Sequence, residues 1–447
     1  FWLKHFFLCA GFVVSLLMGS FTLVSFLWFV TMVNGANWAV IMCGSKLFFN
    51  YRHQANVCRA YHQLKSNGVP EENIILLSAD DAANDEVRNP FPGKLFNVPG
   101  PDGVDVRAGC KPTYSGETAT MNNFLRVLRG DAGVAGPVLQ STSSDQVFVY
   151  YVDHGGPGIL GGPGGAGYLH AEALHRALHE ANSRGLYRDL LFYVDACFSA
   201  SVFEGFNIAP RIKVVVSANA TQEAHGTYCP TDDVVNNFSI GACLSDDFSA
   251  AWFADAEQAN FKTDTVDAQV ARVTARVTRS HVQTFGDVRV GTAVLASFFG
   301  AGGSPHLLSS QTPATAVSVA SSDVPVYVAK HAMILAPTAE RRNVAEADLA
   351  AIVAERERVD AMFVQIAAVA VGASLATQAL AATARQSTLA NSTCHALVVA
   401  DTARLCGSWS DYSLRYSSLL ANLCDLRAAE AISRSIAMVC VEPAAIV

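Results

Sequence analysis

The sequence predicts an α/β protein with a mostly parallel sheet flanked by helices, followed by a small all-helical C-terminal domain. From Trp38 to about Phe299, short apolar runs alternate with segments of helical periodicity. Strands that alternate with helices in this way form a parallel sheet covered by helices. Beyond Asn343 apolar residues recur at helical spacing and strand signals are few.

The expected strands are five apolar runs: WAVIMCGS, NIILLSAD, QVFVYYVDH, LLFYVDAC and IKVVVSAN. Such runs are typical of strands buried on both faces. Helical spacing of apolar residues appears between them, at residues 54–66 and 171–184.

Length and charge limit the classes of function. The chain has 447 residues, of which 51% are hydrophobic, so two domains with a large core are expected. Its net charge of −8 offers no basic surface for phosphates, and a nucleic-acid partner is therefore not expected.

The N-terminal 36 residues are interpreted as a signal peptide. Residues 6–33 carry no charged side chain and could cross a bilayer. A signal peptide is preferred because the chain begins with Phe and a start at Met18 would leave a hydrophobic region of ordinary length. A retained signal anchor is the alternative, and no stable membrane partner is expected if the signal is cleaved.

Composition divides the rest of the chain at two points. Residues 300–325 are rich in Gly, Ser, Thr, Ala and Pro and include one charge, which predicts an exposed linker. The expected units are therefore an α/β domain over 37–300, a linker over 301–342, and a helical domain over 343–447.

Cysteines and glycosylation signals favour the secretory route. Four of the eleven cysteines lie in the last 54 residues, where disulfides are permitted if the chain is exported. Zinc is less favoured because no CxxC spacing occurs. The Asn-X-Ser/Thr sequons are at Asn219, Asn237 and Asn391.

His154 and Cys197 each follow an apolar run at the point where small residues begin. The carboxyl ends of parallel strands are where ligands bind, so an imidazole and a thiol could meet there as base and nucleophile. The N–H groups of Gly155 and Cys197 could hold an oxyanion, and a helix starting behind Cys197 would lower its thiol pKa. Cys43 and Cys58 are expected to be inert core residues.

Residues 155–161, GGPGILG, match the GxGxxG pattern of dinucleotide-binding loops. We interpret this match as a chance one, because the motif follows the third strand and lacks a helix start and an acidic partner. No cofactor and no metal is expected.

Several motifs in order resemble the legumain family, asparaginyl endopeptidases of caspase-like fold. They are NWAVIMCGSKLFFNYRHQANVCRAYHQLKSNGVPEENIILLSADD, FLRVLRGD, YYVDHGGPGIL, FYVDACFSAS, GTYCP and CLSDDFSAAWF. The likeness covers nearly all of residues 37–300, and the four-cysteine tail resembles the C-terminal prodomain of that family.

The resemblance implies roles for individual residues. His154 and Cys197 would form the catalytic dyad, Asn50 would orient the histidine, Gly155 would contribute to the oxyanion hole, and Asp153 matches an aspartate beside the histidine. The substrate-binding residues that it implies are Arg52, His53, Asp195 and Asp246. It favours the disulfides Cys229–Cys243, Cys394–Cys424 and Cys406–Cys440.

A pocket with a guanidinium and a carboxylate suits the carboxamide of asparagine. Arg52 can donate to the amide oxygen and Asp246 can accept from the amide nitrogen. Aspartate would be repelled by Asp246 unless the medium is acidic. Ala224 and His225 depart from the serine and aromatic residue usual in the family, so the rim of the pocket differs.

The expected activity is thus a cysteine endopeptidase that cleaves proteins and peptides after Asn, and after Asp at acid pH, with transpeptidation as a further possibility. The expected location is the vacuole, the lysosome or outside the cell. The alternative is the catalytic subunit of the glycosylphosphatidylinositol transamidase, which has the same fold and dyad. The helical four-cysteine tail favours the peptidase.

Latency is expected from the helical tail, which would act as an intramolecular inhibitor. Arg415 would reach the acidic pocket around Asp246 at neutral pH, and protonation of carboxylates would release it. Self-processing would use Asn343, or Asp323 once acidity permits cleavage after Asp.

Overall fold

A six-stranded sheet forms the centre of the catalytic part, in the order β13-β8-β7-β3-β1-β2. All five expected strands are present, and each runs parallel to its neighbours among them. Their bounds are Asn37–Cys43 for β1, Ile74–Leu77 for β2, Gln146–Val152 for β3, Asp189–Asp195 for β7 and Ile212–Val216 for β8. The prediction of a mostly parallel sheet is confirmed.

The sixth strand was not predicted. It is β13, Gln283–Gly286, which lies at the edge and pairs antiparallel with β8. Its sequence QTFG alternates half-buried and exposed residues and is too short and too polar to give a strand signal.

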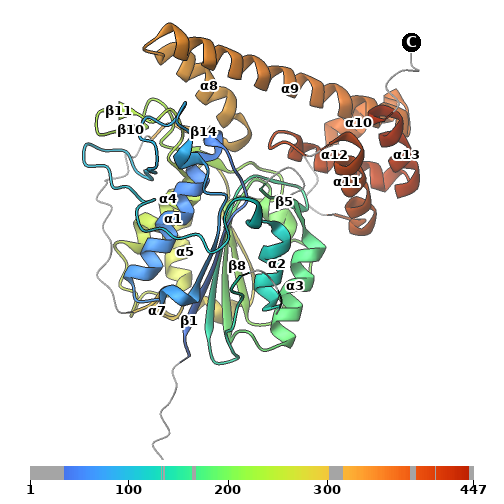
Figure 1. Cartoon of the computed structure of the whole chain (residues 1–447). Coiled ribbons are helices and arrows are strands. Elements are labelled where there is room, and N and C mark those ends of the chain that lie inside the picture. The colour runs from blue at the N-terminus through green and yellow to red at the C-terminus, as the bar shows by residue number, and fades with distance from the viewer. Residues whose placement is uncertain are drawn as a thin grey trace, which may run out of the picture. The chain divides into compact units, whose positions relative to one another are not determined.

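Helices cover both faces of this sheet (Figure 1). One face packs on α1 (Tyr51–Ser66), α4 (Asp247–Ala256) and α5 (Val266–Arg276). The other face packs on α2 (Met121–Arg129) and α3 (Ala171–Ser183). The short helices α6 and α7 span Val288–Gly291 and Ala296–Phe299. The sheet therefore has two apolar cores, and only its strand ends are available to a site.

Short strands surround the carboxyl end of the sheet. A three-stranded sheet follows β3 directly and contains β4 (Gly155–Gly156), β5 (Ile159–Gly161) and β6 (Tyr168–His170). A second one contains β9 (His225–Thr227), β12 (Ser245–Asp246) and β14 (Ser318–Ala320). The hairpin β10–β11 joins Val234–Val235 to Phe238–Ser239.

The computed structural model describes residues 35–131, 133, 136–163, 168–301, 316–382, 389–407 and 409–441. The expected signal segment, residues 1–36, lies almost entirely outside the described residues. Within the described ranges no helix combines the length and the apolar character needed to cross a membrane.

The described part of the expected linker is ordered into elements. Residues 318–320 form β14, 321–323 form a 3₁₀ turn, and α8 covers Val324–Leu335. The prediction of an exposed connection is therefore wrong for residues 318–325, because their backbone pairs with β9 and Val324 is fully buried. Residues 302–315 lie outside the described ranges.

The C-terminal part is helical, as expected. Its further helices are α9 (Ala339–Val371), α10 (Ala373–Ala382), α11 (Ser392–Cys406), α12 (Ser417–Leu426) and α13 (Ala429–Cys440). They enclose a separate apolar core that includes Phe363, Val398 and Leu420. Ile159 of β5 also belongs to this core, so the helical part packs on a strand beside the dyad.

The three expected disulfides are confirmed: Cys229–Cys243, Cys394–Cys424 and Cys406–Cys440. A fourth, Cys58–Cys110, was not expected, so the interpretation of Cys58 as an inert thiol is wrong. The free cysteines of the described ranges are Cys43 and Cys197, both buried.

Candidate active site

The parallel register of β3 and β7 brings His154 and Cys197 to the same edge of the sheet. Val152 of β3 is paired with Asp195 of β7. His154 lies two positions beyond Val152, and Cys197 lies two positions beyond Asp195. The contact is close, since a Cβ on Gly155 would lie 2.3 Å from the carbonyl oxygen of Cys197. The chain can pass here only because residue 155 is glycine.

Asn50 holds the imidazole of His154. Its Oδ1 lies 2.8 Å from His154 Nε2, and its Nδ2 donates to the carbonyl of Lys46 at the start of the same turn. Because an amide oxygen can only accept, Nε2 carries a proton and donates it to Asn50. Nδ1 is then the nitrogen that can receive a proton.

A residue of the helical tail also contacts this histidine. The carboxylate of Asp411 lies 3.2 Å from His154 Nε2 and accepts a hydrogen bond from Asn50 Nδ2 at 3.0 Å. Burial opposes the charge on His154, but the Asp411 carboxylate outweighs it and raises the imidazole pKa. An imidazole that is held protonated cannot act as a base.

The thiol of Cys197 is not activated in this arrangement. Burial raises its pKa well above the usual value, and the charge of Glu223 adds to the effect. The expectation of a helix that lowers this pKa is wrong here, because only a 3₁₀ turn, Ser199–Val202, follows. A helix this short gives little dipole to offset burial. The thiol donates weakly to the Ala224 carbonyl at 3.9 Å.

Arg52 and Asp246 form a fully buried ion pair close to the dyad. Arg52 Nε donates to Asp246 Oδ1 at 2.8 Å, and Asn56 donates to the other carboxylate oxygen at the same distance. Arg52 Nη2 donates to the hydroxyl of Ser321, which follows β14, at 2.7 Å. The pair therefore presents one guanidinium donor to whatever occupies the pocket.

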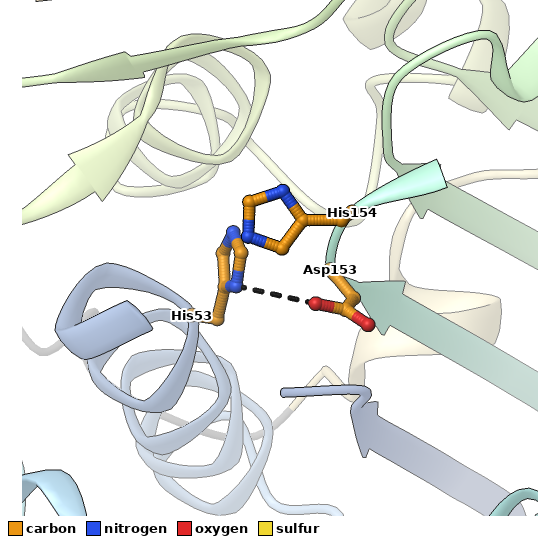
Figure 2. A group of neighbouring side chains, drawn as sticks. All are labelled: His53, Asp153 and His154. Atoms are coloured by element: carbon orange, nitrogen blue, oxygen red, sulfur yellow. Dashed lines mark ion pairs between the residues drawn. The ribbon is translucent and has the colours of Figure 1, made fainter. Parts of the chain in front are cut away.

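His53 connects the pair to the histidine of the dyad. Its Nε2 lies 3.6 Å from Asp246 Oδ2, and its Nδ1 lies 3.6 Å from Asp153 Oδ1 and 2.7 Å from the Ser45 hydroxyl. Figure 2 shows that the rings of His53 and His154 meet edge to face, with Asp153 on the β3 side. Burial lowers the pKa of His53 and raises that of Asp153, so both favour the neutral form.

The side chains of His53, Asp153 and His154 could together hold a metal ion, since their ligand atoms lie within 4.8 Å of one another. One nitrogen of each ring is already hydrogen-bonded, however: His53 Nδ1 contacts Ser45, and His154 Nε2 contacts Asn50. The arrangement is better suited to holding and orienting protons than to binding a metal.

Asp195 lies behind the pocket. Its Oδ2 accepts from the N–H and the hydroxyl of Ser249 at 3.1 and 2.6 Å, in the first turn of α4. Burial, followed by the charge of Asp246, raises its pKa to about 7. Its carboxylate is thus bound to Ser249 rather than to Arg52, and it influences Asp246 by charge.

The segment around β14 lies in the pocket as an extended strand. Ser318, Val319 and Ala320 pair antiparallel with β9. The N–H of Ser321 then donates to the carbonyl of Ala224 at 2.9 Å, the same oxygen that the Cys197 thiol contacts. The segment therefore lies beside Cys197 and places the Ser321 side chain against Arg52.

The helical tail closes over the strand ends that carry the dyad. A Cβ on Gly156 would lie 2.2 Å from the carbonyl of Leu414, and Ser417 donates to the carbonyl of Pro157 at 2.6 Å. The expected contact of Arg415 with Asp246 is wrong. Arg415 instead pairs with Glu223 at 2.7 Å.

Residues 155–161 form β4, β5 and the turn between them rather than a strand-to-helix loop. The rejection of the dinucleotide-binding interpretation is therefore confirmed. The sequence did not reveal three contacts of the site, those of Asp411, Ser321 and Glu223. Each depends on a segment that docks from far along the chain, and no local pattern marks it.

A sheet with a cysteine and a histidine at adjacent carboxyl ends, covered by the chain's own helical tail, defines a cysteine peptidase in zymogen form. Comparison with known proteins agrees. The model of the Peptidase C13 family matches residues 37–301, and that of the legumain prodomain matches residues 347–440. The chain belongs to the peptidase C13 family and is a legumain-like cysteine endopeptidase made with an inhibitory C-terminal domain.

Curated relatives share much of the chain. A vacuolar-processing enzyme of Vicia sativa is 33% identical over 415 residues, which cover 88% of this chain and 83% of the relative. The beta-isozyme of Arabidopsis thaliana is 41% identical over 267 residues, which cover 57% and 54%. Beta-isozyme 1 of Oryza sativa subsp. japonica is 33% identical over 417 residues, covering 89% and 82%.

Gly155→Ala should lower activity by about 100-fold, because the new methyl group would displace either the histidine or the cysteine strand end. The measurement is kcat/KM of the processed enzyme on an Asn peptide, with thermal unfolding as the control for folding. An unchanged kcat/KM would show that the two strand ends are not in contact.

Proposed function

We propose that His154 and Cys197 are the catalytic dyad of an endopeptidase that cleaves after asparagine. The observation that carries this proposal is the buried Arg52–Asp246 pair beside the two strand ends, already occupied by a hydroxyl of the chain itself. A polar side chain that enters this pocket meets one donor and one carboxylate.

The dyad would act once the tail has left. His154 Nδ1 takes the proton of the Cys197 thiol while Asn50 holds Nε2–H, and the thiolate attacks the carbonyl carbon after asparagine. The N–H groups of Gly155 and Cys197 would stabilise the resulting oxyanion. His154 then returns its proton to the leaving amine, and an acyl-enzyme remains.

Water or a second amine resolves the acyl-enzyme. Attack by water, with His154 as base, gives the acid product and regenerates the thiol. Attack by the amine of another peptide would instead give transpeptidation. Both outcomes use the same groups, so the geometry permits both.

The pocket explains the choice of asparagine over aspartate. Arg52 would donate to the amide oxygen, and Asp246 would accept from the amide nitrogen. An aspartate side chain would face the charge of Asp246, so its cleavage requires protonation of one carboxyl. Burial raises the pKa of Asp246, which favours such protonation at a higher pH than for an ordinary aspartate.

The transamidase alternative shares the expected dyad. The legumain prodomain model on residues 347–440 and the names of the relatives favour the peptidase instead.

The names of the relatives also support a vacuolar location. The sequons at Asn237 and Asn391 are exposed and could accept glycans, whereas Asn219 is half-buried.

Cys197→Ala should abolish cleavage and His154→Ala should nearly do so, whereas Cys43→Ala removes an equally buried free thiol and should leave turnover largely intact. The assay compares fluorogenic substrates with Asn, Asp or Lys before the scissile bond. Only Asn should be cut near pH 7, and Asp should be cut on acidification. Full activity of Cys197→Ala, or cleavage after Lys, would contradict the assignment.

Latency would depend on a hydrogen-bonded histidine pair between the two parts. The N–H of Glu172 points to His170 Nδ1 at 3.4 Å, and His170 Nε2 lies 3.2 Å from His395 Nδ1. His395 Nε2 lies 3.0 Å from the carbonyl of Ser417. Each neutral ring in this series of hydrogen bonds accepts at Nδ1 and donates from Nε2. A second proton on either ring would place an N–H group against the donor that points at Nδ1.

Acid would therefore loosen the tail through these rings. Burial lowers the pKa of His395 to about 3 and lowers that of His170. Their contribution to docking is complete above the ordinary histidine pKa of about 6.5 and is lost as the pH falls toward 3. Glu172 is the nearby charge that favours protonation of His170, and its carboxylate is bonded to Ser392.

The contact between His154 and Asp411 has the opposite pH dependence. Because the pKa of His154 is raised when the tail is docked, the free energy that this residue contributes to docking is complete below about pH 6.5. That contribution is lost at higher pH. Burial tends to raise the pKa of Asp411, but the charge of His154 outweighs it and the pKa is lowered to about 2. The contribution of Asp411 to docking of the tail is therefore lost only at strongly acid pH. Release through His170 and His395 would thus act beside the carboxylate-driven release expected from the sequence.

Two cut sites remain candidates for self-processing. Asn343 lies exposed within α9, so its helix would have to unwind before cleavage. Asp323 precedes α8 and pairs with Arg356 at 3.0 Å. Either cut separates the tail from the catalytic part.

His395→Gln should lower the pH midpoint of self-processing by about one unit, because glutamine keeps hydrogen-bonding groups but takes up no proton. His179→Gln is the matched control, since His179 lies on α3 but is exposed and bonds only to the Asn207 carbonyl among the described contacts. The extent of processing after a fixed time is followed from pH 7 to 4. An unchanged midpoint in His395→Gln would contradict the proposed switch.

A further inference from the structure

The segment in the pocket shows how a peptide would continue past the cleaved bond. Ser321 occupies the place of the residue before that bond, since its hydroxyl accepts from Arg52 and its N–H donates to Ala224. The chain direction is fixed by the antiparallel pairing of β14 with β9. Ser322 therefore stands where the first residue after the cleaved bond, P1′, would bind.

Glu223 contacts the residue at this position. Its Oε2 accepts from the hydroxyl of Ser322 at 2.7 Å and from the N–H of Ser322 at 3.4 Å. Its Oε1 accepts from Arg415 Nη2 at 2.7 Å, and the same guanidinium nitrogen lies 3.0 Å from the Ser322 hydroxyl. A hydroxyl and a cation thus share one carboxylate.

We propose that Glu223 selects the residue that follows the cleaved asparagine, favouring lysine, arginine or serine and disfavouring aspartate and glutamate. This inference rests on the proposed function. It concerns the primed side of the site, which the Arg52–Asp246 pocket does not reach.

The physical reason is the environment of Glu223 once the tail has left. With the tail docked its side chain is only 17% exposed. Of the partners described for its carboxylate, Arg415 leaves with the tail, and Ser322 belongs to the segment that a substrate would have to displace from the pocket. A half-desolvated carboxylate without a partner is unfavourable. A substrate that brings a cation or a hydroxyl restores the lost contact, whereas one that brings a carboxylate adds repulsion.

In the zymogen the same carboxylate serves a different purpose. Arg415 stacks on the ring of Tyr412 at 4.6 Å, and Arg356 stacks on the same ring at 4.5 Å. The tail therefore delivers an oriented guanidinium to Glu223, as a basic substrate side chain would. The tail imitates a preferred primed-side residue.

The test uses the self-processed enzyme and peptides that differ only in the residue after asparagine: Lys, Ser, Gln or Glu. Wild type should cleave the Lys and Ser peptides with a kcat/KM about tenfold or more above that of the Glu peptide, the size expected for one charge-assisted hydrogen bond. Glu223→Gln should reduce this ratio to about threefold or less, and Glu223→Lys should reverse it.

Asp247→Asn is the matched control. Its carboxylate accepts from the hydroxyl of Ser318 at 3.0 Å, at the opposite end of the same segment, so it should change kcat/KM equally for all four peptides. A wild-type ranking that survives in Glu223→Gln, or equal cleavage of all four peptides by wild type, would overturn the inference. Failure to cleave any of the Asn peptides would overturn the proposed function instead.

Discussion

The buried ion pair of Arg52 and Asp246 is the constraint on which the rest of the site depends. A guanidinium that is fully buried must be paired and hydrogen-bonded, and here Asn56 and His53 complete the surroundings of the carboxylate. Arg52, His53 and Asn56 all lie on α1, and Asn50 directly precedes it. The same helix start therefore fixes the pocket and, through Asn50, the imidazole of His154. Displacing α1 would disturb recognition and catalysis together.

The latent state uses the surfaces that a substrate would use. Residues 318–320 pair with β9, Ser321 contacts Arg52, and Ser322 contacts Glu223. Asp411 raises the pKa of His154 and so favours its protonated form. Serine in the pocket accepts from Arg52 but offers no carboxamide to Asp246. On the proposed function, inhibition would combine occupation of the pocket with disabling of the expected dyad, since burial also raises the pKa of the Cys197 thiol. The proposed release through His170 and His395 would make this closed state sensitive to acid.

Much of the fold follows from local patterns, and part of the site does too. Buried runs such as QVFVYYV and LLFYVD can only be central parallel strands, and their aligned carboxyl ends predict that His154 and Cys197 lie together. The edge strand β13 was missed because QTFG is short and polar. The order of residues 318–325 was missed because a serine-rich, uncharged stretch gives no signal for pairing with a distant strand. The contact of Asp411 with Asn50 joins residues 361 positions apart, and that of Arg415 with Glu223 joins residues 192 positions apart, so spacing along the chain could not assign them.

The central claim is that residue 321 occupies the specificity pocket in the register of a substrate. Ser321→Asn tests it most directly, because it would place the preferred side chain against Arg52 and Asp246. Ser322→Asn is the matched comparison, one position beyond the pocket. Both full-length variants are held at mildly acid pH, and their fragments are identified by mass spectrometry. The account predicts a new cut after residue 321 in Ser321→Asn, faster than any cut after residue 322 in Ser322→Asn. A Ser321→Asn chain that is processed elsewhere but stays intact after residue 321 would contradict it.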